Sequence, residues 1–341
     1  MSEAAFDRAI APADTLRPQD GLRPRDLDGA MPVDRGNAAL EGLAPAPARD
    51  SRTLDAAAAA RGLPRGDLSA FQRSARHLFA RILAKLIIRP WFRTEIIGAD
   101  RLPDGPAVYC FNHLSWMNPA LLMATFPKTP RMYFYGPKEP NLRKGRRNQF
   151  MWFTGICVPF SPLKDDLLTS VRWAQAVFDT GGVLAISGEG SIHVHEGDLL
   201  PFQEGVAYFA LRSGVPIVPI AITGISWARF RSRVQVRIGE PIQTGDRPTR
   251  QAIAHYTART WHAIRAMVDG DRDLPVPGRI ERWVTDLFND WGPGGRTAAT
   301  QKRGPDPADV PIPPLTQVTP RALGIARSGI TDSATDAGPA G

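Results

Sequence analysis

The sequence has few cysteines, no long apolar run and hardly any aromatic residues near its ends. Cys110 and Cys157 are the only two cysteines in 341 residues, which excludes a disulfide framework and a cysteine-based zinc site and favours a reducing compartment. No segment reaches the ~18 consecutive apolar residues of a membrane-spanning helix. The opening MSEAAFDRAI has no apolar core of a secretory signal. A secreted mini-protein and an integral helical membrane protein are therefore not expected.

The two flanks are too poor in aromatic residues to build a core. Of the 28 aromatic residues only Phe6 lies in 1–66 and none lies in 292–341, although these flanks hold 15 of the 32 prolines. Such segments cannot bury enough apolar surface to offset the entropy lost on ordering. We therefore predict disordered tails at 1–66 and 292–341.

The positive charge lies in the middle of the chain. Residues 67–291 hold 28 basic and 20 acidic residues, which accounts for the whole net charge of +8. This charge suits an anionic membrane surface, a nucleic acid or a phosphorylated small molecule. We expect no nucleic-acid partner, because no basic run with interleaved aromatics and no helix-turn-helix or RNA-binding signature is present.

Residues 67–93 are predicted to form a basic amphipathic helix and the short segment that follows its last turn. Asp67 can cap it, and apolar residues recur at steps of three and four at Leu68, Phe71, Ala75, Leu78, Phe79, Ile82, Leu83 and Leu86. The opposite face carries Arg73, His77, Arg81 and Lys85, and Pro90 should end the helix. Two interpretations stay open: the helix lies at a membrane interface, or it packs on the domain with a solvated basic face.

Residues 94–291 alternate between short β-rich runs and helical stretches. The predicted strands are 107–111, 131–135, 183–187, 217–223 and 234–238, and the predicted helices are 119–126, 167–180, 203–213, 249–268 and 278–291. This alternation is typical of a single α/β domain with a largely buried sheet.

Polar residues follow two of these strands, where α/β folds bind ligands. After the first comes Asn112-His113-Leu114-Ser115-Trp116-Met117-Asn118, in which His113 can act as a general base and Asn118 can orient its ring. Asn118 can equally be a helix N-cap before Pro119.

After the second strand comes Gly188-Glu189-Gly190-Ser191, followed by His193 and His195. The glycines allow close approach of a ligand. A dinucleotide-binding loop is disfavoured because its third glycine is absent, and no G-x-S-x-G elbow of a hydrolase is present. His193 and His195 lack a third metal ligand, so no metal site is expected.

The N-H-x-S-x-x-N block at 112–118 resembles the N-H-x4-D block of the glycerolipid acyltransferases, a family that includes bacterial 1-acylglycerol-3-phosphate acyltransferase. Four further blocks resemble those of the family in the same order: Lys138-Glu139, the segment 155–160, Glu189-Gly190-Ser191, and Phe202 with Gly205 ahead of the VPIVP run at 215–219. The resemblance covers about 95–245. It implies a glycerol-3-phosphate acyltransferase-like fold, with a mostly buried mixed sheet flanked by helices.

The resemblance also implies a mechanism. His113 would deprotonate the hydroxyl of a lysophospholipid or related lipid, which attacks the thioester of acyl-CoA or acyl-carrier protein without a covalent acyl-enzyme. Asn118 would orient His113, and the predicted substrate-binding residues are Ser115, Lys138, Glu189, Gly190, Ser191 and His193. No metal or cofactor is expected, and the protein is expected in the cytoplasm, peripheral on the inner face of the cell membrane.

Three positions depart from the family pattern. Asn118 replaces the aspartate, and Ser161 and Ile192 stand where the family has arginines for the acceptor phosphate. Arg143, Lys144, Arg146, Arg147 and Lys164, together with Lys138, could supply that charge or form a solvated or lipid-facing surface. An acyltransferase is the favoured interpretation, and a catalytically impaired lipid- or acyl-CoA-binding protein on the same fold is the alternative.

Overall fold

The structure is a computed structural model that describes residues 62–138, 145–160, 164–245, 247–292 and 294–315. The predicted amino-terminal tail therefore lies, through residue 61, outside the described residues, as do 316–341 of the carboxyl-terminal tail.

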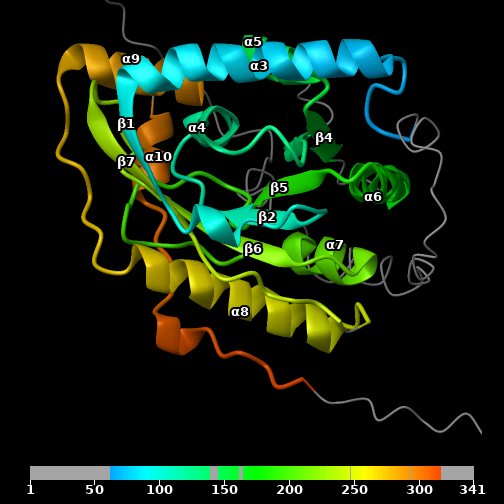
Figure 1. The fold of residues 1–341 in the computed structure, drawn as a ribbon. Helices are drawn as coiled ribbons and strands as arrows, with labels where there is room; N and C mark the ends of the chain where they lie inside the picture. The colour runs from blue at the N-terminus through cyan, green and yellow to red at the C-terminus, as the bar shows by residue number, and fades with distance from the viewer. Residues whose placement is uncertain (1–61, 139–144, 161–163, 246, 293, 316–341) are drawn as a thin grey trace, which may run out of the picture.

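One seven-stranded sheet organises the fold (Figure 1). Its strands are β1 (Phe92–Ile97), β2 (Val108–Phe111), β3 (Met132–Lys138), β4 (Cys157–Phe160), β5 (Val183–Ser187), β6 (Ile217–Thr223) and β7 (Ser232–Ile238). They are ordered β1-β7-β6-β2-β5-β3-β4. All neighbouring pairs are parallel except β6 with β7. The mixed sheet predicted from the sequence is confirmed.

Helices cover both faces of the sheet. They are α3 (Ala70–Trp91), α4 (Met117–Thr125), α5 (Arg146–Thr154), α6 (Lys164–Asp179), α7 (Gly205–Ser213), α8 (Arg250–Val268), α9 (Arg279–Asn289) and α10 (Gly295–Thr300). One core contains residues of α3, α4 and α5 with side chains of α9 packed against it, and the other contains residues of α6, α7 and α8. Figure 1 shows α3 and α9 above the sheet and α8 below it.

The central strands were predictable because they are buried on both faces. Every residue of β2 and β6 is buried, so these strands read as continuous apolar runs. The edge strands β1 and β4 were missed. The sequence FRTEII of β1 is half exposed and pairs only with β7, so its pattern lacks the apolar run of a central strand.

Helix α3 is present as predicted, but its basic face is buried and its apolar face is exposed. Arg73, His77 and Arg81 are buried against the domain, whereas Phe71 is 81% and Leu86 67% exposed. The expectation of a solvated basic face is therefore wrong. Buried guanidinium groups are tolerated here because backbone carbonyl groups surround them.

The hydrogen bonds of these arginines show how the burial is compensated. Arg73 donates to the carbonyl oxygens of Pro64 and Arg65, and Arg81 donates to those of Phe126 and Pro127 just beyond α4. The carboxyl end of a helix favours a positive charge, so Arg81 anchors α3 to α4.

The ends of α3 also differ from the prediction. Ser69 rather than Asp67 caps the helix, in a capping box with Gln72, while Asp67 pairs with Arg65. The helix continues past Pro90 to Trp91. None of the helices in the described part of the chain is long and apolar enough to cross a membrane.

Part of the carboxyl-terminal flank, residues 294–315, has a defined structure that its composition did not indicate. Helix α10 and the short turn Pro307–Asp309 lie in 294–315, the described part of the predicted tail. The prediction of disorder therefore does not hold for 294–315. These residues add no core of their own, but they are held by hydrogen bonds to the domain, such as that from Gly304 N–H to Asp198 Oδ2 at 3.0 Å.

Candidate active site

The two polar strand ends meet at one edge of the sheet. β2 and β5 are parallel neighbours with Phe111 opposite Ser187, so the residues that follow them start side by side. The Gly188 N–H donates to the Phe111 carbonyl oxygen at 3.1 Å, and the His193 N–H to that of His113 at 3.2 Å. The sheet register therefore brings the His113 block and the Glu189 block together.

Glu189 holds this junction from within the core. Its side chain is fully buried, with Oε1 accepting the His113 N–H at 2.6 Å and Oε2 accepting the Leu200 N–H at 2.9 Å. The Oε2 atom also lies 2.9 Å from His193 Nε2. Glu189 thus fixes the backbone of His113 and does not line the cavity beside the histidine ring.

His193 is the buried neighbour of Glu189, with its Nε2 2.9 Å from Glu189 Oε2. Burial by itself lowers the pKa of His193, but the negative charge of Glu189 and its hydrogen bond outweigh that effect and raise it. His193 lies in the core with no exposed side-chain surface, so the structure places it behind the site.

Gly188 and Gly190 are required by the local geometry. A Cβ atom at Gly188 would lie 2.7 Å from the ring of Phe202, so this glycine lets Phe202 close the loop. Gly190 has a φ of 67°, which is in the left-handed region.

The two asparagines of the first block bond to the backbone. Asn112 continues the pairing of β2 with β6, because its Oδ1 accepts the Ile222 N–H at 2.7 Å and its Nδ2 donates to the Ile222 carbonyl at 2.9 Å. Asn118 is not the N-cap, which is Trp116, but lies in the first turn of α4 and donates from Nδ2 to the Asn112 carbonyl at 2.7 Å.

The His113 ring has no carboxylate partner among the described residues. Its Nδ1 atom is buried and unpartnered, and so is Oδ1 of Asn118. A histidine ring nitrogen and an amide oxygen are thus both left without a hydrogen bond within one loop. The ring itself packs edge-on against Phe111 and Trp116, with centroids 6.1 and 5.6 Å apart.

Ser115 has a structural environment. It is fully buried, its Oγ donates to Asn289 Oδ1 at 3.2 Å and accepts the Met117 N–H at 3.2 Å. Asn289 Oδ1 also accepts the Trp116 N–H at 2.9 Å. Ser115 therefore ties the end of α9 to this loop through a contact between residues 174 positions apart in the sequence.

A cavity of about 310 Å³ opens beside His113. It is lined by His113, Trp116, Gly190, Ser191, Ile192, Trp291, Gly295, Ala298, Ala299 and Lys302. Of the predicted site residues, His113, Gly190 and Ser191 reach it. The side chain of Lys138 lies outside the described residues.

Positive charge surrounds His113. Burial, followed by the charges of His193 and Arg147 and a smaller effect of Lys302, lowers the pKa of His113 to about 3. The Arg147 guanidinium lies 4.0 Å from the centre of the Trp116 ring and donates to the Phe288 carbonyl at 2.9 Å. His113 is therefore neutral at physiological pH, as a general base must be.

Of the other basic residues that could supply charge, Arg146 is exposed, and Arg143 and Lys144 lie outside the described residues. The side chain of Lys164 is likewise not described. Arg147 is thus the member of this group that the structure places near the site.

His195 joins the carboxyl-terminal segment to the domain. Its Nδ1 lies 2.7 Å from Asp273 Oδ2 and its Nε2 2.9 Å from the Thr300 carbonyl oxygen. Both ring nitrogens are thus occupied by protein groups, so His195 and His193 are not presented together to a metal.

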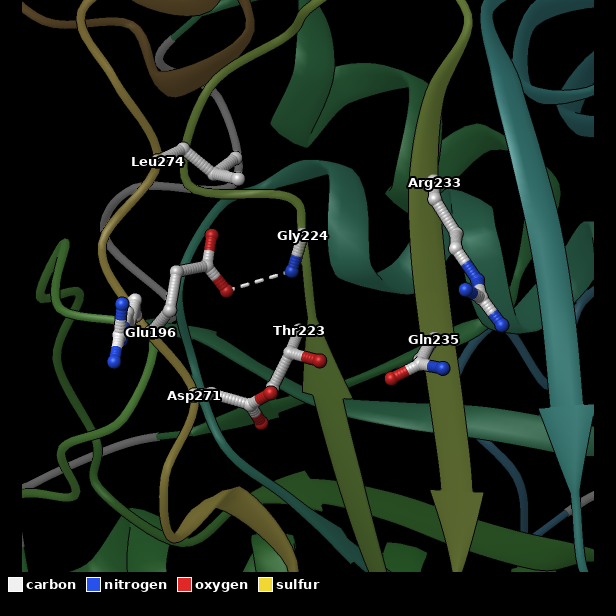
Figure 2. A pocket seen from close by; sticks show the side chains of 8 residues that line it. Glu196, Thr223, Gly224, Arg233, Gln235, Asp271 and Leu274 are labelled. Carbon is white, nitrogen blue, oxygen red and sulfur yellow. Dashed lines mark hydrogen bonds between the residues drawn. The ribbon is translucent and has the colours of Figure 1, made fainter.

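A second, polar cavity of about 170 Å³ follows along the same loop (Figure 2). Figure 2 shows Glu196 bonded to Gly224, whose N–H it accepts at 2.6 Å, and it also accepts the Ser226 N–H at 2.9 Å. Asp271 pairs with Arg237. Both carboxylates are bonded to protein donors, and Glu196 in particular holds the turn after β6.

The part of the chain that contains the His113 and Glu189 blocks is similar in sequence to known proteins. The Acyltransferase family model matches residues 93–223. The chain is 26% identical over 171 residues to 1-acyl-sn-glycerol-3-phosphate acyltransferase BAT2, chloroplastic, of Brassica napus, and 27% identical over 161 residues to the alpha 1-acyl-sn-glycerol-3-phosphate acyltransferase of Bos taurus. Each match covers 45% of this chain, and 44% and 55% of the respective relatives, so the chain spans about half their length.

A solved structure, the 1-acyl-sn-glycerophosphate acyltransferase PlsC of Thermotoga maritima, aligns with a TM-score of 0.47 and 17% identity, covering 62% of this chain and 90% of that one. The family match spans β1 to β6 and contains both the His113 block and the Glu189 block. The similarity to the Acyltransferase family model is thus confined to residues 93–223, from β1 to the end of β6.

Proposed function

We propose that this protein transfers a fatty acyl group from a thioester, acyl-CoA or acyl-carrier protein, to the hydroxyl of a lysophospholipid of the 1-acylglycerol-3-phosphate type. The observation that carries the proposal is the cavity beside His113, in which a neutral histidine faces Gly190 and Ser191. The names of the relatives support the substrate class.

In the proposed mechanism His113 is the general base. Because Nδ1 is buried, Nε2 is the nitrogen left for the acceptor hydroxyl. His113 takes the hydroxyl proton while the oxygen attacks the thioester carbonyl carbon. The tetrahedral intermediate collapses with cleavage of the carbon–sulfur bond, and the proton passes from His113 to the thiolate. No acyl-enzyme forms.

Asn118 would select the required tautomer. A base acting through Nε2 carries its proton on Nδ1, and Asn118 Oδ1 is a buried acceptor without a partner in the same loop. We propose that these two atoms pair during turnover. An asparagine can orient a histidine in this way, although it does not supply the charge that stabilises the imidazolium.

The test is acyl transfer by the purified full chain with lauroyl-CoA and 1-lauroylglycerol-3-phosphate, followed by thiol release and product analysis. His113→Ala should lower kcat about 10²-fold or more. His255→Ala, on α8, is the matched control and should leave the rate unchanged. Absence of transfer, or full activity of His113→Ala, contradicts the proposal.

A second candidate function is a binding protein that has lost the chemistry. It is favoured by the absence of a described carboxylate at the His113 ring and by Asn118 Nδ2, which is committed to the Asn112 carbonyl. It predicts that lauroyl-CoA and the lysophospholipid bind without release of free thiol. Measurable thiol release that requires both substrates and His113 would exclude it.

We also propose that the protein docks peripherally on a membrane through an apolar outer face. This face consists of Phe71, Leu78, Phe79, Ile82 and Leu86 on α3 and Ile280, Trp283 and Leu287 on α9, all between 45% and 81% exposed. Exposed apolar residues concentrated on two helices are typical of an interaction site. The buried basic side of α3 leaves its apolar side free for lipid.

Vesicle flotation tests the docking. The triple variant Phe71→Ser, Leu78→Ser, Leu86→Ser should lose binding to lipid vesicles while remaining folded, since it changes only exposed side chains. The control, Leu168→Ser with Ile312→Ser, removes exposed apolar residues outside the outer face. Unchanged flotation of the triple variant contradicts the proposal.

A further inference from the structure

The carboxyl-terminal segment forms one wall of the His113 cavity. Gly295, Ala298, Ala299 and Lys302 line it together with the segment 190–192. These four residues lie far beyond the family-matched region 93–223. The wall is therefore a feature of this chain that the family motifs do not describe.

Contacts at Arg296, Thr300 and Gly304 hold this carboxyl-terminal wall in place. The Arg296 guanidinium lies 3.0 Å from the centre of the Trp227 ring and donates to the Ser226 carbonyl at 3.1 Å. The Thr300 carbonyl bonds to His195 Nε2. Beyond Lys302, Gly304 lies so close to Leu199 that a Cβ atom would meet the Leu199 oxygen at 2.0 Å. The position of Lys302 beside the cavity is thus set by contacts before and after it.

Lys302 brings an uncompensated positive charge to this cavity. No carboxylate of the described residues forms an ion pair with it, and its side chain is partly buried. Arg147, the other cation near His113, is engaged by the Phe288 carbonyl and lies 3.9 Å from Asp290. Lys302 is therefore the cation with free hydrogen-bonding capacity on the cavity wall.

The lining segment 190–192 contributes no cation. Ile192 lines the cavity directly after Ser191, so this segment offers an apolar side chain next to a hydroxyl and the backbone of Gly190. A phosphate monoester carries up to two negative charges and needs a charged donor when it leaves water. Within the cavity lining, Lys302 supplies that donor.

We propose that Lys302 binds the phosphate of the acyl acceptor, so that a residue of the carboxyl-terminal segment determines the preference for a phosphorylated lysolipid. The inference rests on the proposed function of the same cavity. The acceptor would lie with its phosphate between Lys302 and Ser191 and its free hydroxyl at His113.

Equilibrium binding tests this role without requiring turnover. Calorimetry on the full chain would compare 1-lauroylglycerol-3-phosphate with neutral 1-lauroylglycerol, both below their micelle-forming concentrations. Lys302→Met should weaken binding of the phosphorylated ligand about 10- to 100-fold, as expected for loss of a hydrogen bond to a charged group, and leave binding of the neutral ligand unchanged. Lys302→Arg should retain the preference.

Arg303→Met is the matched control, because it removes a neighbouring exposed cation outside the cavity lining. The inference is overturned if Lys302→Met keeps the preference, if the wild type shows none, or if inorganic phosphate binds as tightly as the lysolipid, which would indicate an ion site. A second variant, Lys302→Gln, checks that the effect follows the charge. Failure of acyl transfer with Lys302-dependent binding intact would reject only the proposed function.

Discussion

Glu189 shows how one buried carboxylate organises the site. It accepts backbone N–H groups from His113 and Leu200 and pairs with His193, so it joins three segments inside the core. The sequence predicts that Glu189 binds substrate, and in the structure its oxygens are engaged by protein donors.

We expect Glu189→Gln to destabilise the fold strongly. The amide has one acceptor oxygen where two are needed, and it leaves His193 buried without its counter-charge, so the free energy of unfolding should fall by about 3 kcal/mol. Urea unfolding measures this. Glu204→Gln, on the same loop at the start of α7 and without a capping bond, should change it by less than about 0.5 kcal/mol. Equal effects of the two variants would contradict the role of Glu189.

His77 should make stability fall with acid. Burial, followed by the charges of Arg131, Arg81 and Lys128, lowers its pKa in the folded state to about 3, whereas an unfolded histidine titrates near 6.5. Between these values only the unfolded chain binds the proton. The contribution of neutral, buried His77 to the free energy of unfolding is therefore complete above pH 6.5. It falls by about 1.4 kcal/mol for each pH unit below that value.

Urea unfolding at pH 6.5 and pH 5 measures this loss. His77→Leu should flatten the dependence relative to wild type, and His255→Asn, in α8, should not. A slope that is the same in wild type and His77→Leu would show that His77 does not contribute.

At the scale of elements, α3 shows why a helical period does not say which face is inward. Its apolar residues form a stripe that would suit a core, yet the opposite side is buried. That side can be buried because small residues, Ala80 and Ala84, allow close packing and because Arg81 reaches the carbonyls beyond α4. Which face of α3 is buried therefore depends on groups distant in the sequence, such as the carbonyls of Phe126 and Pro127.

Arg81→Met should therefore loosen the attachment of α3. The carbonyl groups of Phe126 and Pro127 would lose their donor, which should cost about 1–3 kcal/mol in the free energy of unfolding. Arg89→Met, on an exposed position of the same helix, is the control and should cost less than about 0.5 kcal/mol. Thermal or urea unfolding distinguishes them, and equal losses would argue against the anchoring role of Arg81.

The molecule as a whole combines an apolar outer face with an excess of positive charge. The region 67–291 holds 28 basic and 20 acidic residues, so an anionic surface should attract it before the apolar side chains of α3 and α9 engage. The two contributions can be separated because salt screens charge but does not weaken apolar burial.

We expect the wild type to float more completely with vesicles containing phosphatidylglycerol than with phosphatidylcholine alone at ~50 mM salt. Raising the salt to ~500 mM should remove that difference and leave a residual binding that depends on the outer face of α3 and α9. Equal binding to both vesicles at low salt would show that the positive charge takes no part.

The α/β class, the central strands and the position of the His113 and Glu189 blocks at strand ends could be predicted from the sequence alone. These follow from local patterns, because continuous apolar runs pair in the middle of a sheet and the carboxyl ends of parallel neighbours share one edge. Composition was a poorer guide to the carboxyl-terminal flank. Composition indicates whether a segment can form its own core, whereas 294–315 packs Val310 and Leu315 on a core formed elsewhere and adds hydrogen bonds and one stacked arginine.

Three features could not be predicted and came from the folded structure: the buried face of α3, the burial of Ser115, Glu189 and His193, and the place of Lys302 in the cavity lining. Each of these depends on contacts between residues far apart in the chain: Ser115 with Asn289, Arg81 with Phe126, Thr300 with His195. A periodic pattern fixes the conformation of a segment, whereas the free energy of burying a charge or a hydroxyl depends on whether a distant group is there to bond it.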